Sequence, residues 1–408
     1  MKKRVVVTGM DLVSSLGSGL NNFWDSAVQG KSGIQKITSY DPSPYTTQIG
    51  GEIKELPLQD LPQFNKPKRY PKVAQYALYC AHHAIHQSGL DLSALAKAGT
   101  YIGTSLGGTP ELESAYQAFY QDSWKKIPAL SVLRGMPNSV ANHLAISFGI
   151  KGPNATFSNA CVSSAEAIGH AYQQISAGRL NSAICGGTES LVWETIMAAW
   201  CKLRVMTTEN ETPQTACRPF DKNRSGMVMA DGAGILVLEE YEHAKARGAT
   251  ILGEIIGYGA SCDASHVTAP SSEGQARAIQ AALSDAKTSP SDIQYISAHG
   301  TGTKLNDATE TQTIKSVFGH LAYDIPITAQ KAMTGHAIGG AGVLEIIATL
   351  LCMQHGILLP TINLTHPDPD CDLDYVANKA RKKSVQVAMS NHFAFGGANA
   401  VLVLSQVD

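Results

Sequence analysis

The sequence predicts a large α/β protein made of two domains or of one doubled domain. With 408 residues, 44% of them hydrophobic and 16% charged, the chain can bury an extensive core. The apolar runs at residues 5–7 and 182–187 are typical of buried strands. Residues 155–187 follow the pattern of a strand, a turn, a helix and a second strand, which is a building unit of α/β folds.

Composition excludes several functional classes. The formal net charge of -2 argues against a nucleic-acid coat. The eight cysteines include no C-x-x-C pair, so we expect neither a metal site nor a disulfide framework, and we expect a reducing cytoplasm. We expect no signal peptide and no membrane span, because no run of 18 apolar residues occurs. Asp11 stands where a dinucleotide-binding fingerprint needs its second glycine.

The first elements along the chain are a strand, a helix and an irregular segment. Three consecutive valines at residues 5–7 predict a central parallel strand, because such strands are buried on both faces. A short amphipathic helix is expected at residues 23–33, and the Pro- and Ser-rich residues 34–63 are expected to be irregular. A basic cluster then leads into a helix at residues 73–89, and it consists of Lys66, Lys68, Arg69 and Lys72. This cluster is either a solvated face or a dock for an acidic partner.

The middle of the chain alternates strands and helices. A strand at residues 101–104 ends in a Gly-rich turn, and residues 131–149 are expected to form a helix with Pro137 near its start. A polar loop precedes a strand at residues 235–238. The helix after it ends at Gly248, where we place the boundary between the two halves.

Cys161 lies in the turn of the strand–turn–helix–strand unit. At a helix N-terminus, free amide groups and the positive end of the helix dipole favour a thiolate over a thiol. A sharp turn also presents the sulfur to a cleft, so the pattern predicts a nucleophile. The alternative is that Cys161 is one more small buried residue, which is common for free cysteines.

Two histidines in the second half of the chain occupy similar settings. A strand at residues 293–298 delivers His299 into a turn rich in glycine and threonine, and a strand at residues 325–329 leads through Lys331 to His336. A lone histidine beside glycines is usually structural. Two of them at strand ends can place both imidazoles at one sheet edge, where ligands bind in open α/β folds.

Three acids accompany these histidines. Asp307 and Glu310 have the spacing of an acidic N-cap with an acid at the third position, so we interpret them as structural first. Glu345 is the one buried-looking acid in the apolar helix expected at residues 343–353.

Taken in order, the motifs closely resemble those of the elongating β-ketoacyl-acyl carrier protein synthases (type I/II) of the thiolase-like superfamily. The resemblance covers essentially the whole chain, and it rests on residues 5–9, Ala160-Cys161, Ser163-Ser164, residues 218–221, residues 231–234, residues 299–303, Lys331, Gly335-His336 and residues 393–399. It implies a thiolase-like fold in which two similar α/β halves form a five-layer αβαβα arrangement. The N-terminal half would be residues 1–248, with Cys161, and the C-terminal half residues 249–408, with His299, Lys331 and His336.

The resemblance implies a decarboxylative Claisen condensation. An acyl carrier protein would deliver an acyl group to Cys161, because a soft thiolate is both a nucleophile and a leaving group. A malonyl carrier protein would then lose carbon dioxide, and His299 and His336 would stabilise the enolate oxygen. The product would be a β-ketoacyl chain two carbons longer, made in fatty acid or in polyketide or polyene synthesis.

The resemblance also assigns supporting roles. Lys331 would orient the histidines through Glu345, with Asp307 and Glu310 in support. The amides of Cys161 and Phe395 would form a second oxyanion site, in a gating loop that includes Ala394 and Gly396. Thr268, Thr301 and Thr303 would contact the phosphopantetheine arm, which the carrier protein supplies, so no cofactor or metal would be bound by the enzyme itself. The carrier protein would dock at Lys66, Lys68, Arg69 and Arg204.

Several positions depart from the usual family pattern: Asn159 replaces a threonine, His392 a serine, Ser265 a tyrosine and Ala394 a glycine, and Pro137 falls in the tunnel-lining helix. We expect Ala394 to narrow the motion of the gate, because glycine has more backbone freedom. We interpret these departures as specialisation for a secondary pathway. The resemblance implies a homodimer, or a heterodimer with a chain-length-factor subunit, with residues near Met136 reaching the partner's acyl tunnel.

Three alternatives stay open. A thiolase acting on coenzyme A thioesters usually has a second catalytic cysteine near the C-terminus, whereas the last cysteine here is Cys371. A non-catalytic chain-length factor would not need Cys161, His299 and His336. A stand-alone malonyl decarboxylase would keep the histidines and typically lose the cysteine.

Overall fold

The computed structural model describes residues 2–54, 56–58, 61, 64 and 69–407. Within these residues, eleven strands form one continuous mixed sheet. Its N-terminal side runs β6 (Asn154–Phe157), β5 (Gly99–Gly103), β7 (Ser182–Glu189), β8 (Gly232–Glu240) and β1 (Val5–Ser14), with β2 (Gly17–Ser18) paired to β1. Its C-terminal side runs β9 (Gly253–Cys262), β15 (Ala398–Ser405), β14 (Val387–Phe393), β10 (Tyr295–Ser297) and β11 (Ile327–Thr328).

The two sides of the sheet repeat one topology. On the N-terminal side β5 is parallel to β6 and β7, and on the C-terminal side β10 is parallel to β11 and β14. The remaining pairs within each side are antiparallel. The sides meet where β1 pairs with β9 over the three residues 5–7. The prediction of two similar α/β halves is therefore confirmed.

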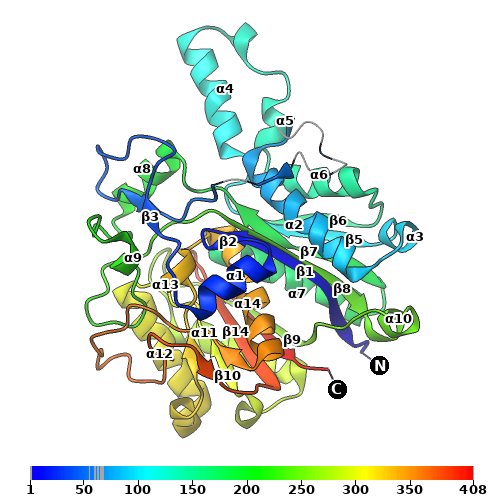
Figure 1. The fold of residues 1–408 in the computed structure, drawn as a ribbon, viewed down its shortest axis with the longest axis vertical. Helices are drawn as coiled ribbons and strands as arrows, with labels where there is room; N and C mark the ends of the chain where they lie inside the picture. The colour runs from blue at the N-terminus through cyan, green and yellow to red at the C-terminus, as the bar shows by residue number, and fades with distance from the viewer. Residues whose placement is uncertain (1, 55, 59–60, 62–63, 65–68, 408) are drawn as a thin grey trace.

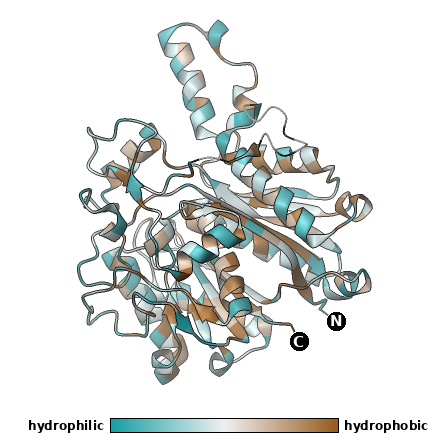
Figure 2. Cartoon of the chain, viewed as in Figure 1, coloured by the Kyte–Doolittle hydropathy of each residue, from teal (hydrophilic) through white to brown (hydrophobic). Residues whose placement is uncertain are grey.

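Helices cover both faces of each half-sheet, which gives five layers (Figure 1). Helices α7 (Ser163–Ser176) and α14 (Ala341–His355) form the central layer, and the largest hydrophobic cluster joins them to the inward faces of the strands. Helices α2 (Lys72–Ser88) and α6 (Ser139–Phe148) cover the N-terminal half, and α11 (Ser272–Ala286) and α12 (Lys304–Phe318) cover the other half. The apolar residues gather on the strands and on α14 (Figure 2).

Strand β8 shows why the sequence folds into layers. Its residues alternate between two hydrophobic clusters, with Ile235 and Val237 facing the cluster of α2, and Leu236 and Leu238 facing the cluster of α7 and α14. Because successive side chains in a strand point to opposite faces, a strand covered on both faces must be apolar throughout.

The same argument corrects the prediction for β1. The strand is central, as expected, but it is antiparallel to both β8 and β9 rather than parallel. Its three valines indicate that the strand is buried on both faces, and they do not indicate its direction. An antiparallel strand with helices on both sides of the sheet has the same apolar sequence as a parallel one.

The segment Ile338–His355, which contains α14, is the one described helix that is long and apolar enough to cross a membrane by length and composition. It is 89% buried inside the protein. A helix that is hydrophobic on all sides belongs in a core when other elements surround it, and here both half-sheets do so.

Proline breaks the helix predicted at residues 131–149. The structure has α5 (Ser131–Gly135) and α6 instead, and Met136 between them is extended, as the residue before a proline usually is. Helix α5 belongs to a projection with α4 (Thr109–Gln121) and η3 (Trp124–Lys126), seen at the top of Figure 1. The amphipathic helix predicted at residues 23–33 lies earlier, as α1 (Leu20–Val28).

The remaining elements are short. They are β3 (Gln35–Lys36), β4 (Ile49–Gly50), α3 (Leu92–Leu95), η4 (Ala160–Val162), α8 (Glu194–Leu203), α9 (Pro213–Ala216), α10 (Tyr241–Ala246), η5 (Pro290–Asp292), η6 (Gly319–Tyr323), α13 (Lys331–Thr334), η7 (Ile338–Gly340), β12 (Ile357–Leu358) and β13 (Arg381–Lys382).

Candidate active site

Cys161 lies in η4, between the end of β6 and the start of α7, as the pattern predicted. The preceding residue, Ala160, has a φ of 45°, which an L-residue adopts only when its surroundings hold it there. Two hydroxyls hold this turn, because Ser105 and Ser163 both donate to the Ala160 carbonyl. The side chain of Asn159 points away and donates to Glu166.

Burial decides the protonation state of Cys161, whose side chain is 3% exposed. It raises the pKa of the thiol to about 12, although Lys331 and the main-chain amide of Phe395 lower it. The expectation that the helix N-terminus makes a thiolate is therefore wrong for the resting protein. Removal of the sulfur from water outweighs the charge of Lys331 and the amide of Phe395.

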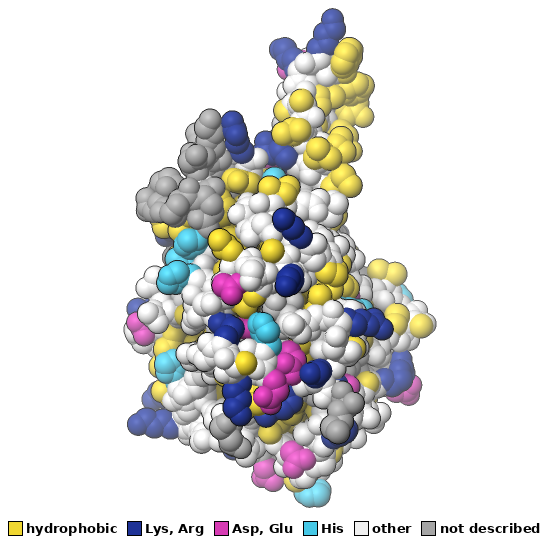
Figure 3. Space-filling model, turned by 90° about the vertical axis from the view of Figure 1, so that its right-hand side faces the viewer, with side chains coloured by type: hydrophobic (Ala, Val, Ile, Leu, Met, Phe, Trp, Pro, Cys, Tyr) yellow, Lys and Arg dark blue, Asp and Glu magenta, His cyan; other side chains and the backbone are white. Residues whose placement is uncertain are grey.

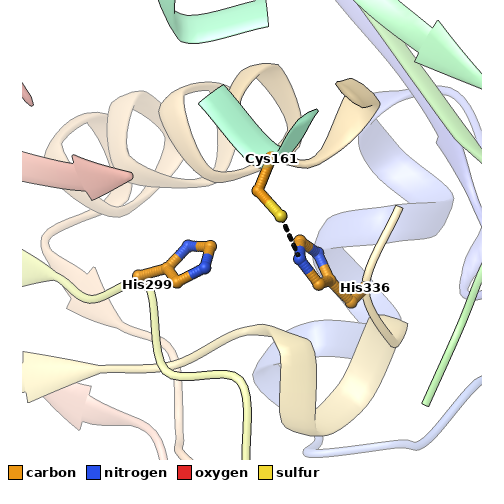
Figure 4. Close-up of side chains that lie close together, drawn as sticks. All are labelled: Cys161, His299 and His336. Atoms are coloured by element: carbon orange, nitrogen blue, oxygen red, sulfur yellow. Dashed lines mark hydrogen bonds between the residues drawn. The ribbon is translucent and has the colours of Figure 1, made fainter. Parts of the chain in front are cut away.

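His336 approaches the sulfur from the opposite half. Its main chain follows the end of β11 and α13, and it is fixed between Val228 and Ala230 by two hydrogen bonds of 2.7 and 3.0 Å. The ring Nε2 lies 3.1 Å from Cys161 Sγ (Figure 4). Ile338, just before α14, has a φ of 39° and so repeats in this half the strained turn of Ala160 before α7.

His299 completes the trio at the end of β10 (Figure 4). Its ring centroid is 5.4 Å from that of His336, because their strands are parallel neighbours that end at one edge. Burial, followed by the charge of Lys331, holds the pKa of both histidines well below its usual value. Both imidazoles are therefore neutral at neutral pH.

Asp307 and Glu310 do not cap a helix, which corrects the prediction. Helix α12 begins at Lys304 with Thr303 as its N-cap, so both acids lie inside the helix and are fully buried. Glu310 accepts hydrogen bonds from the amides of His299 and Gly300, at 2.8 and 2.9 Å. Asp307 accepts from the amides of Phe220 and Gly302. The two carboxylates therefore hold the turn that carries His299.

Lys331 and Glu345 form a buried ion pair behind His299. The Lys331 ammonium also donates to the His299 carbonyl, at 2.6 Å, and lies 3.3 Å from His299 Nδ1. Because an ammonium is only a donor, Nδ1 must accept, and the ring proton of His299 is on Nε2.

An open pocket of about 240 Å³ reaches the trio, whereas Lys331 and Glu345 are not among the residues that line it. Its lining includes Cys161, His299 and His336 together with Thr268, Thr301, Thr303, Ala394 and Phe395. Gly396 is not among the lining residues, but its amide donates to the Val267 carbonyl at 2.7 Å. The loop around Phe395 is thus attached to the loop of Thr268.

The two predicted docking residues that the structure describes, Arg69 and Arg204, do not line this pocket. Arg204 is exposed at the C-terminal end of α8, next to Val205, which lines the pocket. Arg69 is also exposed, whereas Lys66 and Lys68 lie outside the described residues. Ser265 is exposed in the loop of Thr268 and does not line the pocket.

Sequence reasoning missed Glu189, a fully buried acid at the end of β7. Its carboxylate accepts hydrogen bonds from the amides of Ser105, Leu106 and Gly339, and so joins the loops on both sides of Cys161. Burial raises its pKa to about 7. The sequence could have indicated Glu189, because it is a single acid at the end of an apolar strand. His299 was predicted from the same kind of position.

The trio also has the composition of a metal site. Cys161 Sγ and one ring nitrogen of each histidine lie within 4.8 Å of one another, which no other three ligand side chains do in the part of the chain that the structure describes. The Lys331 ammonium, 3.3 Å from His299, opposes a second cation there. The arrangement suits a developing negative charge better, because two neutral imidazoles and the main-chain amide of Phe395 surround the nucleophile.

A buried cysteine at a strained helix start, facing two neutral imidazoles in a doubled α/β fold, defines a thiolase-fold acyltransferase. The family model "Beta-ketoacyl synthase, N-terminal domain" matches residues 2–244, and "Beta-ketoacyl synthase, C-terminal domain" matches residues 252–365. The chain therefore belongs to the β-ketoacyl synthase family.

Full-length relatives agree with this family. The chain is 38% identical to the 3-oxoacyl-[acyl-carrier-protein] synthase 2 of Staphylococcus aureus strain COL, over 100% of this chain and 99% of the relative. It is 39% identical to the synthase 2 of Synechocystis sp., over 99% and 98% of the two chains.

Solved structures of similar proteins cover both chains completely. A beta-ketoacyl synthase from Burkholderia phymatum STM815 is 34% identical, with a TM-score of 0.93. The ishigamide ketosynthase/chain length factor is 33% identical, with a TM-score of 0.91. A type II PKS ketosynthase, solved in complex with its acyl-carrier protein and bound to the hexaketide, is 32% identical, with a TM-score of 0.91.

Proposed function

We propose that this protein condenses an acyl thioester with malonyl-acyl carrier protein and releases carbon dioxide and a β-ketoacyl-acyl carrier protein. The observation that carries the proposal is that Cys161, His299 and His336 meet in the lining of one pocket. A nucleophile and two neutral donors at one point suit both halves of such a reaction.

In the first half-reaction, Cys161 takes the acyl group. Because the thiol is protonated at rest, His336 Nε2, 3.1 Å away, accepts its proton as the sulfur attacks the carbonyl. The amides of Cys161 and Phe395 bind the developing oxyanion. The bond to the carrier sulfur breaks, and the departing thiolate receives the proton.

In the second half-reaction, a malonyl group loses carbon dioxide beside the acylated cysteine. His299 donates to the enolate oxygen through Nε2, because Lys331 occupies Nδ1. His336 returned its Nε2 proton to the departing carrier thiolate, so it donates to the same oxygen after its remaining ring proton exchanges from Nδ1 to Nε2. The enolate carbon then bonds to the acyl carbon, the bond from that carbon to Cys161 Sγ breaks, and the departing thiolate takes a proton from solvent. Thr268, Thr301 and Thr303 contact the phosphopantetheine arm that carries both substrates, so the enzyme needs no cofactor of its own.

The partner is an acyl carrier protein that docks at the pocket mouth. Carrier proteins of this kind are acidic, and the exposed cations Arg69 and Arg204 provide the opposite charge. The neighbour solved with its acyl-carrier protein supports this assignment.

The protein also pairs with a second copy of itself. The projection of α4, η3 and α5 exposes one strip of large apolar side chains (Figure 3), which consists of Tyr116, Phe119, Tyr120, Trp124, Leu130, Val132, Leu133 and Met136. A continuous apolar strip of this size marks an interaction surface. A chain-length factor is the other partner that could cover this strip, and the ishigamide ketosynthase/chain length factor suggests it.

The alternatives are less well supported. A thiolase would need a second cysteine in the pocket, but among the described residues the pocket includes only Cys161, and Cys371 packs in the core of the C-terminal half. A non-catalytic subunit would have no use for the Lys331–Glu345 pair behind His299. The free state of all eight cysteines supports a place in the cytoplasm.

Intact-protein mass spectrometry tests the proposal. The protein is mixed with acyl carrier proteins that bear different chains, in parallel with Cys161→Ala. We expect a gain of one acyl group in the wild type and none in the variant. Malonyl carrier protein should then remove the acyl group and yield a product two carbons longer. Absence of acylation from every chain would contradict the proposal, and the preferred chain distinguishes a fatty acid from a polyketide substrate.

A further inference from the structure

His392 lies on β14 next to the Lys331–Glu345 pair and is fully buried. Its Nδ1 is 3.0 Å from Glu345 Oε2, the oxygen that Lys331 does not occupy, and its Nε2 is 3.0 Å from Ser390 Oγ. A continuous chain of contacts thus runs from Ser390 through His392, Glu345 and Lys331 to His299. The side chain of His392 thus joins Glu345, on α14, to strand β14.

The direction of each hydrogen bond in this chain can be assigned. Burial lowers the pKa of His392, against the raising effect of Glu345, so the ring is neutral and carries one N–H. Glu345 Oε2 is an acceptor, so that proton is on Nδ1, and Nε2 accepts from the Ser390 hydroxyl.

The other end of the chain is equally constrained. Lys331 has three N–H groups, and they reach Glu345 Oε1, the His299 carbonyl and His299 Nδ1. All three are used, so the ammonium cannot turn without losing a buried hydrogen bond. The tautomer of His299 therefore depends on an ammonium whose carboxylate partner, among the described residues, is Glu345.

We infer that His392 is a positioning residue for malonyl decarboxylation. It donates to the second oxygen of Glu345, fixes the orientation of that carboxylate beside Lys331, and thereby holds His299 with its proton on Nε2. The inference deepens the proposed function and rests on it. Without His392, Oε2 would be a buried oxygen with no hydrogen-bond donor among the described residues, which is costly enough for Glu345 to turn away from Lys331.

The two half-reactions should respond differently. Acylation uses Cys161 and His336, whose mutual contact of 3.1 Å does not involve this chain of side chains. Decarboxylation uses the His299 donor, which does depend on it. A purely structural role would instead impair both half-reactions together with stability.

Two substitutions separate these outcomes. In His392→Asn the amide nitrogen can take the place of Nδ1 and donate to Glu345, whereas His392→Leu fills the space without a donor. Val403→Ala is a control for damage to the core, because Val403 is fully buried on the adjacent β15 and contacts none of these side chains by hydrogen bonds. Acylation is measured by intact mass and decarboxylation by carbon dioxide release from malonyl carrier protein.

For His392→Leu we expect carbon dioxide release to fall by about 10- to 100-fold, as for a misplaced catalytic group, with acylation changed less than about threefold. His392→Asn should recover most of the loss. Nitrogen-15 NMR of the histidine rings, assigned with His299→Ala, should show Nδ1 of His299 unprotonated in the wild type and a mixture of tautomers in His392→Leu.

The inference is overturned if His392→Leu keeps wild-type decarboxylation, if both half-reactions fall equally, or if the His299 signals do not change. A wild type that neither acylates nor decarboxylates would instead contradict the proposed function. In that case the NMR comparison still decides whether His392 controls the tautomer of His299.

Discussion

At the scale of single residues, burial sets the protonation states that the chemistry starts from. Cys161 is a thiol and both histidines are neutral, since each lies in a medium that disfavours charge. The nucleophile is therefore generated during the reaction, with His336 as the proton acceptor. A resting thiolate would make the cysteine prone to oxidation, which a buried thiol avoids.

The protonated state of the Cys161 thiol predicts how this residue reacts with iodoacetamide. Because burial raises the pKa of the thiol to about 12, the alkylation rate should keep rising between pH 7 and pH 10, without a plateau. Peptide mass spectrometry resolves Cys161 from the exposed Cys262, which is the internal control. A plateau below pH 8 would show that the resting group is a thiolate.

Asp11 provides a test of stability against pH. Its Oδ2 has no partner among the described residues, and burial raises its pKa from 3.8 to about 7, against two main-chain amides that lower it. The folded pKa exceeds the unfolded one, so the stabilising contribution is complete below about pH 4 and is lost as the pH rises to 7.

Asp11→Asn cannot ionise, and its amide oxygen can keep the main-chain bonds. At pH 8 we expect this variant to be more stable than the wild type, by on the order of 2–4 kcal/mol, and at pH 5 the gain should be much smaller. Urea unfolding at the two pH values measures this. Equal effects at both would show that Asp11 is already ionised in the folded protein at pH 5, so that burial does not raise its pKa.

At the scale of elements, small residues let α7 and α14 cross closely and so bring Cys161 to His336. A Cβ on Gly342 would lie 3.0 Å from Ser164 Oγ and 3.1 Å from Ala165 Cβ. The Ser164 hydroxyl also accepts from the Val343 amide at 3.1 Å. A Cβ on Gly103 would lie 2.3 Å from the main chain of Ser163, where no shift of a side chain can relieve it.

We therefore expect a graded response to alanine at these glycines. Gly103→Ala should lose about 3 kcal/mol or more of stability and most acylation activity, as overpacking of rigid backbone does. Gly342→Ala should lose less stability but still slow condensation, because it moves α14 relative to Cys161. Thermal unfolding and acyl transfer measure both effects.

Gly178→Ala is the control for these variants. No atom lies within 4 Å of its added Cβ, although its φ of 73° disfavours alanine. We expect a loss of about 1 kcal/mol and unchanged acylation. Activity lost equally in all three variants would refute the packing argument.

At the scale of the whole molecule, two surfaces govern association. Leu133 is 64% exposed in the apolar strip of the projection. We expect light scattering to give twice the mass of one chain for the wild type and a single chain for Leu133→Glu, because a charge in a buried apolar contact is costly. Leu92→Glu, on α3 and 82% exposed, should remain a dimer. A monomeric wild type that pairs only with a chain-length factor would contradict self-pairing.

The pocket mouth governs docking of the carrier protein. Arg204→Glu should raise the KM for acyl carrier protein several-fold with little change in kcat, and high salt should reduce the difference. Lys287→Glu is a matched control, since it lies at the far end of α11, about 22 Å along the helix from the loop of Thr268. Equal effects of the two variants would indicate a general response to charge.

The sequence by itself determined the doubled α/β pattern and the trio of Cys161, His299 and His336. These signals are local, because Cys161 lies in a turn between a strand and a helix, and each histidine follows a strand and lies beside glycines, and such turns lie at the edge of a sheet. Pro137 by itself predicts the break between α5 and α6, because proline cannot continue a helix. The prediction of a single helix over residues 131–149 did not take this local rule into account.

Only the tertiary structure decided the charges and the supporting contacts. Glu189, Glu310 and His392 act on partners from other segments, and nothing in their own neighbourhood in the sequence reveals those partners. Strand direction in β1 and the thiol state of Cys161 also depend on what packs around them. Pattern and composition determine which residues are buried, whereas the three-dimensional packing determines which groups they are buried against, and that sets their hydrogen bonds and pKa values.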